Sequence, residues 1–95
     1  MNQVLLINRI NTNDNSIIKR RISFILGGMS LSSMKDMLID TINSSGLIDD
    51  SNDVLYKYNG VEISMSIQTI PKIVRLLANA NIPIYSVYEV YNSDL

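Results

Sequence analysis

The sequence predicts one small α+β domain of the ferredoxin-like class, a βαββαβ sandwich with an antiparallel sheet and both helices on one face. Three observations support this prediction: a helical pattern over 30–46, an Asn59-Gly60 dipeptide between two strand-like runs, and a helix followed by a strand over 69–91. A chain of 95 residues can bury one hydrophobic core but not two. We therefore expect residues 1–95 to form a single domain.

The first expected strand is QVLLINRI, residues 3–10, a short apolar run that the polar cluster NTNDN ends. The next run, residues 15–28, fits two patterns. Helical spacing connects five apolar residues: Ile18, Ile22, Ile25, Leu26 and Met29. A strand is the alternative, because Ile22, Phe24 and Leu26 alternate with other residues. We predict a helix here, as an extra element in the βαββαβ order.

The run SLSSMKDMLIDTINSSG, residues 30–46, predicts a helix. Its apolar face is formed by Leu31, Met34, Met37, Leu38 and Ile42. Ser33 and Asp36 have the spacing of a capping box, and Gly46 is placed just past the end.

The runs VLYKY and VEISM flank Asn59-Gly60, a dipeptide that accepts the positive φ angles of a type I′ turn. A hairpin with this turn has four expected cross-strand pairs: Tyr58 with Val61, Tyr56 with Ile63, Val54 with Met65, and Lys57 with Glu62. The first three pairs make one face apolar, and the fourth makes the other face polar.

The last third of the chain predicts a helix from the N-cap Thr69, with Pro71 in its first turn and an end at 79–81. IYSVYEVY, residues 84–91, is then a strand because β-branched and aromatic residues dominate it. Simple alternation places Ile84, Ser86, Tyr88 and Val90 on one face and Tyr85, Val87, Glu89 and Tyr91 on the other.

The composition argues against several kinds of function. The chain has no histidine and no cysteine, so it lacks the commonest general base, the commonest metal ligand and any thiolate. No phosphate-binding GxxxxGK motif occurs. A net charge of −1 provides no general attraction for nucleic acid. We expect no enzyme activity, no catalytic residue, no cofactor and no nucleic-acid partner.

Two charged clusters have simple structural interpretations. Asp49, Asp50 and Asp53 do not match the ligand spacing of an EF-hand, so we expect a solvated loop and no metal site. The basic run 19–21 is interpreted as the solvated face of its element. No apolar window approaches a membrane span and the start of the chain lacks a secretory signal pattern, so we expect a cytoplasmic chain without membrane insertion.

Aromatic residues in the expected strands are the best candidates for a contact surface. The candidate interface residues are Tyr56, Tyr58, Tyr85, Val87, Tyr88 and Tyr91. Three hypotheses fit such a set: packing within the core, a protein interface, and a stacking surface for single-stranded RNA. The absence of flanking Lys or Arg places RNA last.

The closing segment TIPKIVRLLANANIPIYSVYEVYNSDL resembles the C-terminal accessory domain of ABC transporter ATP-binding subunits of the bacitracin- and lantibiotic-exporter types. The resemblance covers residues 54–95 and is carried by Ile73, Leu76, Leu77, Ile82, Ile84, Val87 and Asp94-Leu95. It implies a noncatalytic module that binds or regulates a transporter ATPase or permease.

The sequence as a whole predicts a noncatalytic, regulatory protein-interaction domain that acts through a sheet face or strand edge and forms a homodimer. The alternative is a module that binds a small ligand or single-stranded nucleic acid on the tyrosine-bearing sheet face.

Overall fold

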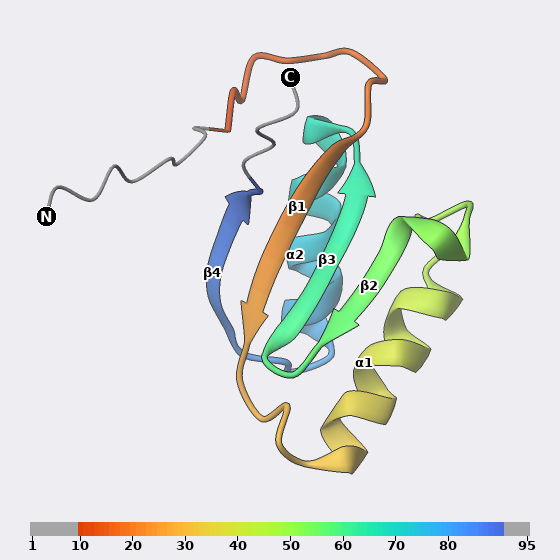
Figure 1. Ribbon diagram of the computed structural model, residues 1–95, viewed down its shortest axis with the longest axis vertical. Helices are drawn as coiled ribbons and strands as arrows, with labels where there is room; N and C mark the ends of the chain where they lie inside the picture. The colour runs from red at the N-terminus through yellow and green to blue at the C-terminus, as the bar shows by residue number, and fades with distance from the viewer. Residues whose placement is uncertain (1–9, 91–95) are drawn as a thin grey trace, which may run out of the picture.

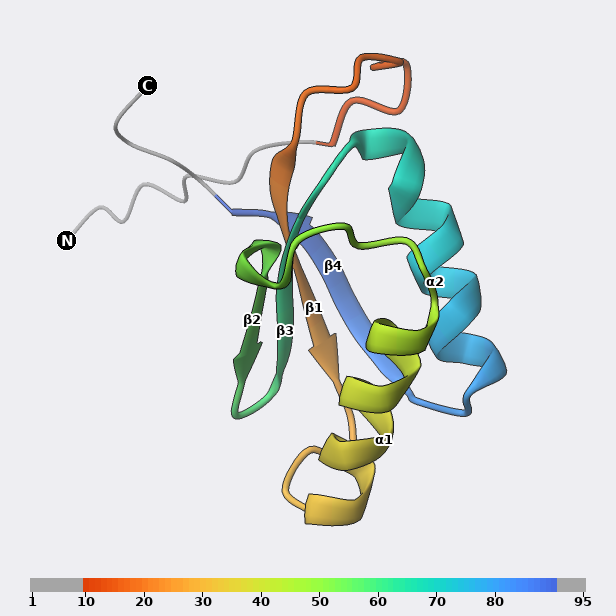
Figure 2. The ribbon, with the colours of Figure 1, turned by 90° about the vertical axis from the view of Figure 1, so that its right-hand side faces the viewer.

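The computed structural model describes residues 10–90, which form a four-stranded antiparallel sheet with two helices on one of its faces (Figures 1 and 2). The elements are β1 (Arg20–Leu26), α1 (Ser32–Ser44), η1 (Ser51–Asp53), β2 (Val54–Lys57), β3 (Gly60–Met65), η2 (Ile67–Thr69), α2 (Ile70–Asn79) and β4 (Ile84–Glu89). The strands lie in the order β2-β3-β1-β4, so β2 and β4 are the edges. The prediction of an α+β fold with an antiparallel sheet is confirmed.

The prediction of a helix over 15–28 is wrong, because these residues contain the central strand β1. β1 pairs antiparallel with β3 on one side and β4 on the other. Ile22, Phe24 and Leu26 alternate along β1 and are buried under the helices. Ile18, which the helical pattern also requires, is exposed. The strand predicted over 3–10 lies outside the described residues, apart from Ile10, which is not in a strand.

The hairpin of β2 and β3 is confirmed, but its turn lies one residue earlier than predicted. Tyr58 and Asn59 form the turn and Lys57 pairs with Gly60. The predicted register is therefore wrong: Val54 pairs with Ile63, Leu55 with Glu62 and Tyr56 with Val61. The side chains of Lys57 and Glu62 are nevertheless in contact, at 2.8 Å, on the predicted polar face. Because the pairing is shifted by two residues, the side chains of β2 and β3 stay on their predicted faces, whereas Tyr58 lies in the turn.

The neighbouring strand β1 explains the position of this turn. A Cβ atom at Gly60 would lie 1.9 Å from the carbonyl oxygen of Phe24. The amide of Leu26 also donates a hydrogen bond to the carbonyl of Asn59, at 2.8 Å. The glycine is therefore required where β3 touches β1, and the turn adjusts to this contact.

The two helices agree with the predicted segments but not with all predicted caps. α1 begins after Leu31 without a side-chain cap, so the capping box of Ser33 and Asp36 is wrong. Gly46 follows the end of α1 with a φ of 71°. Thr69 does precede α2, yet no side chain caps that helix either. Asn81, with a φ of 60°, ends the chain reversal after α2.

The core lies between the sheet and the helices. Its buried residues are Ile22, Phe24, Leu26, Met29, Leu38, Ile42, Val61, Ile63, Met65, Ile67, Ile73, Leu77 and Ile82. Within residues 10–90, neither helix is long and apolar enough to cross a membrane.

A β-bulge interrupts the alternation of β4. Leu26 pairs with Ile84 and Ile25 with Ser86, which leaves Tyr85 as an extra residue between them. Ile84 and Val87 consequently both pack against the core. The predicted division of β4 into two faces is therefore wrong for Ile84.

Candidate interaction surfaces

The candidate interface residues do not share one surface. Tyr58, Tyr85 and Tyr88 are 83%, 75% and 41% exposed, respectively. Tyr56 and Val87 instead pack against the core. Tyr91 lies outside the described residues.

The three exposed tyrosines also belong to different parts of the sheet. Tyr58 is in the turn of the hairpin and Tyr85 is at the bulge of β4. Tyr88 pairs with Ser23 and so lies on the face that the helices leave uncovered, here called the open face. Tyr88 is the one tyrosine on this face among the paired positions of the described strands. RNA-binding sheets stack successive bases on adjacent aromatic rings, and these strands have no such pair of rings on the open face.

The free side of β4 is the first candidate surface. The amide of Val90 donates to the carbonyl of Arg21 at 2.9 Å. Backbone groups alternate in direction along an antiparallel strand, so those of Ser86 and Tyr88 also point toward β1. The N–H and C=O groups of Val87 and Glu89 consequently point outward, where residues 10–90 provide no further strand.

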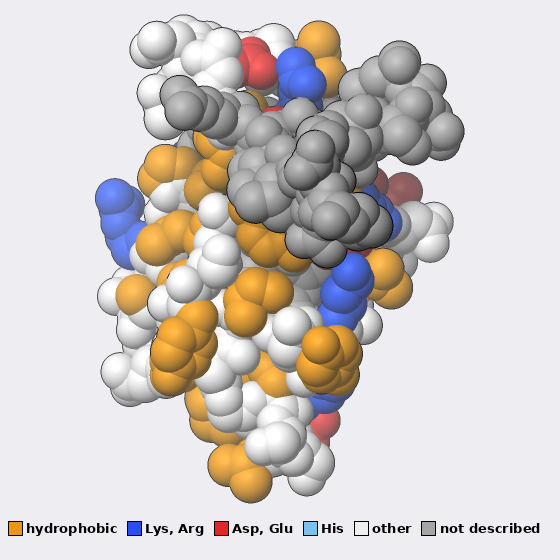
Figure 3. All heavy atoms as spheres, turned by 60° about the vertical axis from the view of Figure 1, so that its left-hand side comes forward, with side chains coloured by type: hydrophobic (Ala, Val, Ile, Leu, Met, Phe, Trp, Pro, Cys, Tyr) orange, Lys and Arg blue, Asp and Glu red, His pale blue; other side chains and the backbone are white. Residues whose placement is uncertain are grey.

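Little on β4 opposes pairing with another strand. It has no Lys or Arg, and its one charged residue, Glu89, is turned toward Arg20, with 3.6 Å between carboxylate and guanidinium. The other edge, β2, has four residues, ends in Lys57 and follows the 3₁₀ turn η1. Figure 3, turned toward the β4 side, shows hydrophobic and uncharged polar groups with Lys and Arg at the margins. By these criteria β4 is the less protected edge.

An ion-pair cluster on the open face is the second candidate surface. Two cations contact the carboxylate of Glu62: the Lys57 ammonium at 2.8 Å and Nε of Arg21 at 3.3 Å. Nη1 of Arg21 also donates to the hydroxyl of Ser64 at 3.3 Å. The hydrogen bond to Glu62 raises the pKa of Lys57 above its ordinary value, so the ammonium form is favoured. We call Arg21, Lys57, Glu62 and Ser64 the open-face cluster.

All three residues of the basic run form ion pairs, so it is more than a solvated face. Lys19 pairs with Asp53, Arg20 with Asp14 and Glu89, and Arg21 with Glu62. Gln68 adds two hydrogen bonds of 2.9 Å from its side-chain amide to the carbonyls of Thr12 and Asp14. These contacts hold the segment before β1 against the rest of the domain.

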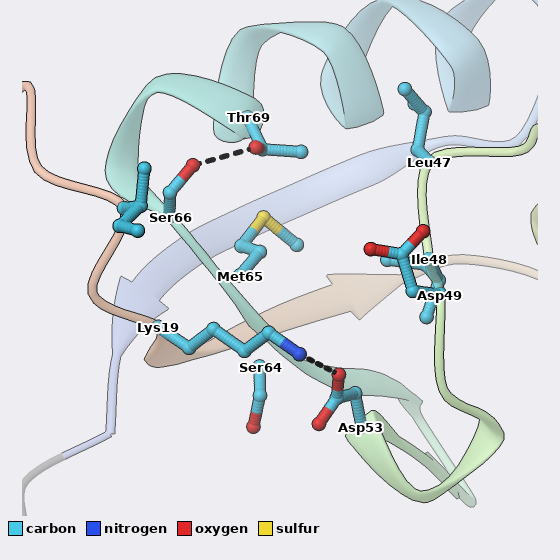
Figure 4. A pocket seen from close by; sticks show the side chains of 10 residues that line it. Lys19, Leu47, Ile48, Asp49, Asp53, Ser64, Met65, Ser66 and Thr69 are labelled. Atoms are coloured by element: carbon cyan, nitrogen blue, oxygen red, sulfur yellow. Dashed lines mark hydrogen bonds and ion pairs between the residues drawn. The ribbon is translucent and has the colours of Figure 1, made fainter.

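A small polar hollow of about 160 Å³ lies beside this segment, at the end of β3 and the start of α2 (Figure 4). Its polar side chains are largely paired with one another. Lys19 bonds to Asp53, which raises the pKa of Lys19, and the hydroxyls of Ser66 and Thr69 are 2.8 Å apart. Asp49 lines the same hollow. No group of three or more acidic residues within 10–90 could hold a metal ion.

Comparisons with known proteins give no relative. No family model matches the chain, and no curated protein or solved structure matches it.

Proposed function

We propose that this chain is a noncatalytic protein-interaction domain that associates with a second copy of itself through β4. The observation that carries the proposal is the free edge of β4, with outward backbone groups at Val87 and Glu89 and exposed rings at Tyr85 and Tyr88. Unpaired donors and acceptors on a strand edge are a template for another strand, and two-fold pairing is the simplest closed arrangement.

We further propose that the fold is ferredoxin-like. The element order β1-α1-β2-β3-α2-β4 supports this, once the two short 3₁₀ turns are set aside. In the strand order β2-β3-β1-β4, β3 lies between β1 and β2, and β1 lies between β3 and β4. Each helix thus connects two strands that have one strand between them, the split βαβ arrangement.

One register satisfies the free groups of β4. If Tyr88 lies opposite Tyr88 of the second copy, Val87 and Glu89 exchange backbone hydrogen bonds with Glu89 and Val87 of that copy. The two tyrosines then form a pair without backbone hydrogen bonds, in which side chains are closest. The two Glu89 carboxylates are not directly opposite, so like charges are not forced together.

Sedimentation equilibrium from about 1 µM to about 1 mM tests self-association. In this register Tyr88→Lys places two ammonium groups opposite each other, so we expect dimerisation to weaken by about tenfold or more. Tyr58→Lys is the matched control, because it makes the same charge change in the hairpin turn, which lies beyond β1 and β3 from β4.

Two results would refute the dimer proposal. One is a wild-type chain that stays monomeric throughout this range. The other is equal weakening by Tyr58→Lys and Tyr88→Lys, which would mean that added charge, and not its place on β4, is responsible. Leu55→Lys, on the open face of β2, separates edge pairing from face packing: it weakens association only if the face is the contact.

The resemblance of residues 54–95 supports a second partner, and we propose an ABC transporter ATP-binding subunit for that role. Titration of a purified bacitracin-exporter-type subunit with this chain should produce a complex in sedimentation velocity. If none forms at about 100 µM of each protein, the transporter proposal fails while the dimer proposal is unaffected.

A further inference from the structure

We infer that the open-face cluster binds a carboxylate of an acidic segment from a partner protein. This site adjoins the proposed dimer contact at Tyr88, but its cations lie on the face of the sheet over β1 and β2 rather than along the edge of β4.

The charge balance of the cluster is the first reason. Glu62 is the only carboxylate within the cluster, and it contacts both Lys57 and Arg21. Its side chain is 9% exposed, whereas those of Arg21 and Lys57 are 40% and 41% exposed. The buried carboxylate therefore positions two accessible cations and neutralises one of them. One net positive charge remains on the open face.

Unused hydrogen-bond donors are the second reason. Within residues 10–90, Nη2 of Arg21 has no hydrogen-bond or ion-pair partner, and the Lys57 ammonium has one partner for its three protons. Hydrogen bonds from such groups to a carboxylate are charge-assisted and stronger than those between neutral groups. Because Glu62 already fixes the two cations, a ligand would lose little by ordering them.

The neighbours of the cluster define the kind of ligand. Leu55, Glu62, Ser23 and Tyr88 form one row across the four strands. Leu55 and Tyr88, at the two ends of the row, are exposed. Arg21 and Lys57 lie in the positions on either side of this row, so cations and apolar groups lie close together on this face. Such a surface matches an extended segment with an acidic residue between apolar ones. A polyphosphate backbone would need several cations, and the chain has a net charge of −1.

The test is an NMR titration of ¹⁵N-labelled protein with the peptide acetyl-Leu-Glu-Leu-amide, and with the same peptide carrying Gln in place of Glu. We expect the Glu peptide to shift signals of Arg21, Lys57 and Tyr88 at millimolar concentration, and the Gln peptide to bind about tenfold more weakly. Lys57→Gln should weaken binding by a similar factor while leaving the Arg21–Glu62 pair in place. Lys72→Gln, an exposed lysine on α2, should have no effect.

Several outcomes would overturn the inference. They are equal binding of the two peptides, no shift at about 10 mM peptide, or tighter binding of oligouridylate to the same residues, which would assign the face to nucleic acid. Inorganic phosphate binding as tightly as the Glu peptide would indicate an anion site without peptide recognition. If Lys57→Gln disturbs the spectrum as a whole, Arg21→Gln replaces it. If peptide binding is unchanged in both variants, the open-face cluster is not the binding site.

Discussion

Replacing Gly60 with alanine should be the most damaging single methyl addition in this domain. The added Cβ would lie 1.9 Å from the carbonyl oxygen of Phe24, whereas real Cβ contacts essentially never fall below 3.0 Å. The atoms nearest to this position are backbone atoms of Phe24 and Ile25 in β1, which cannot rotate away as a side chain can. β3 must therefore move from β1 by about 1 Å at this point.

That displacement breaks the hydrogen bond from the Leu26 amide to the carbonyl of Asn59 and disturbs the next hydrogen-bonded pair of the two strands, Phe24 with Val61. Two hydrogen bonds at about 1 kcal/mol each, with the backbone strain at a φ of 157°, give an expected loss of about 3 kcal/mol in the free energy of unfolding. Urea unfolding followed by far-UV circular dichroism measures this loss.

Gly46→Ala is the matched control. Gly46 also has a positive φ, of 71°, but a Cβ there meets nothing within 4 Å. This variant should lose only about 1 kcal/mol, from backbone strain alone. If Gly60→Ala is no less stable than Gly46→Ala, the close approach of β1 to Gly60 is wrong.

Three further predictions concern two titratable residues, Tyr56 and Asp14. The hydroxyl of Tyr56 is buried and has no hydrogen-bond partner among residues 10–90, so Tyr56→Phe should raise the free energy of unfolding by about 1 kcal/mol. A decrease would show that the hydroxyl is bonded. Burial also raises the pKa of Tyr56 above its ordinary value of 10.0. The resulting contribution to the free energy of unfolding is present below pH 10.0 and is lost as pH rises through the folded pKa. Tyr56→Phe should therefore reduce the decline in stability at alkaline pH, measured by urea unfolding. Ser16, whose backbone amide donates to the carboxylate of Asp14 at 2.9 Å, lowers the pKa of Asp14, and the charge of Arg20 lowers it further. The contribution of Asp14 to the free energy of unfolding is present above the ordinary pKa of 3.8 and is lost as pH falls through the folded pKa. Asp14→Asn should therefore make the free energy of unfolding less dependent on pH in acid. If this dependence is unchanged, the lowered pKa of Asp14 is wrong.

Local sequence patterns are sufficient for the parts of the fold that depend on one segment. The spacing of Leu38 and Ile42 identifies α1, and Thr69 with Pro71 marks the start of α2. β1 is different, because Ile22 and Leu26 fit both a helical face and one side of a strand. Only the pairing of β1 with β3 and β4 decides between them, and no local pattern contains that information.

The candidate surfaces, too, depend in part on strand pairing that no local pattern predicts. Tyr58, Tyr85 and Tyr88 are exposed, as a contact surface requires, whereas Tyr56 packs against the core. The open-face cluster was predictable only in part. The hairpin pattern predicts that Lys57 faces Glu62, but the place of Arg21 depends on a strand beside β3, where the sequence pattern favours a helix. A glutamate within VEISM, a run that is otherwise apolar apart from serine, was the available signal, because a buried carboxylate needs cationic partners.

The bulge at Tyr85 sets the character of any complex that β4 forms. It interrupts regular geometry near the start of the strand, so a neighbouring chain can align in register only along Ser86–Glu89. Pairing over so few residues makes few backbone hydrogen bonds, so the complex should dissociate quickly. Protomers would then exchange readily between dimers. Another strand that pairs with β4 could also displace the second copy.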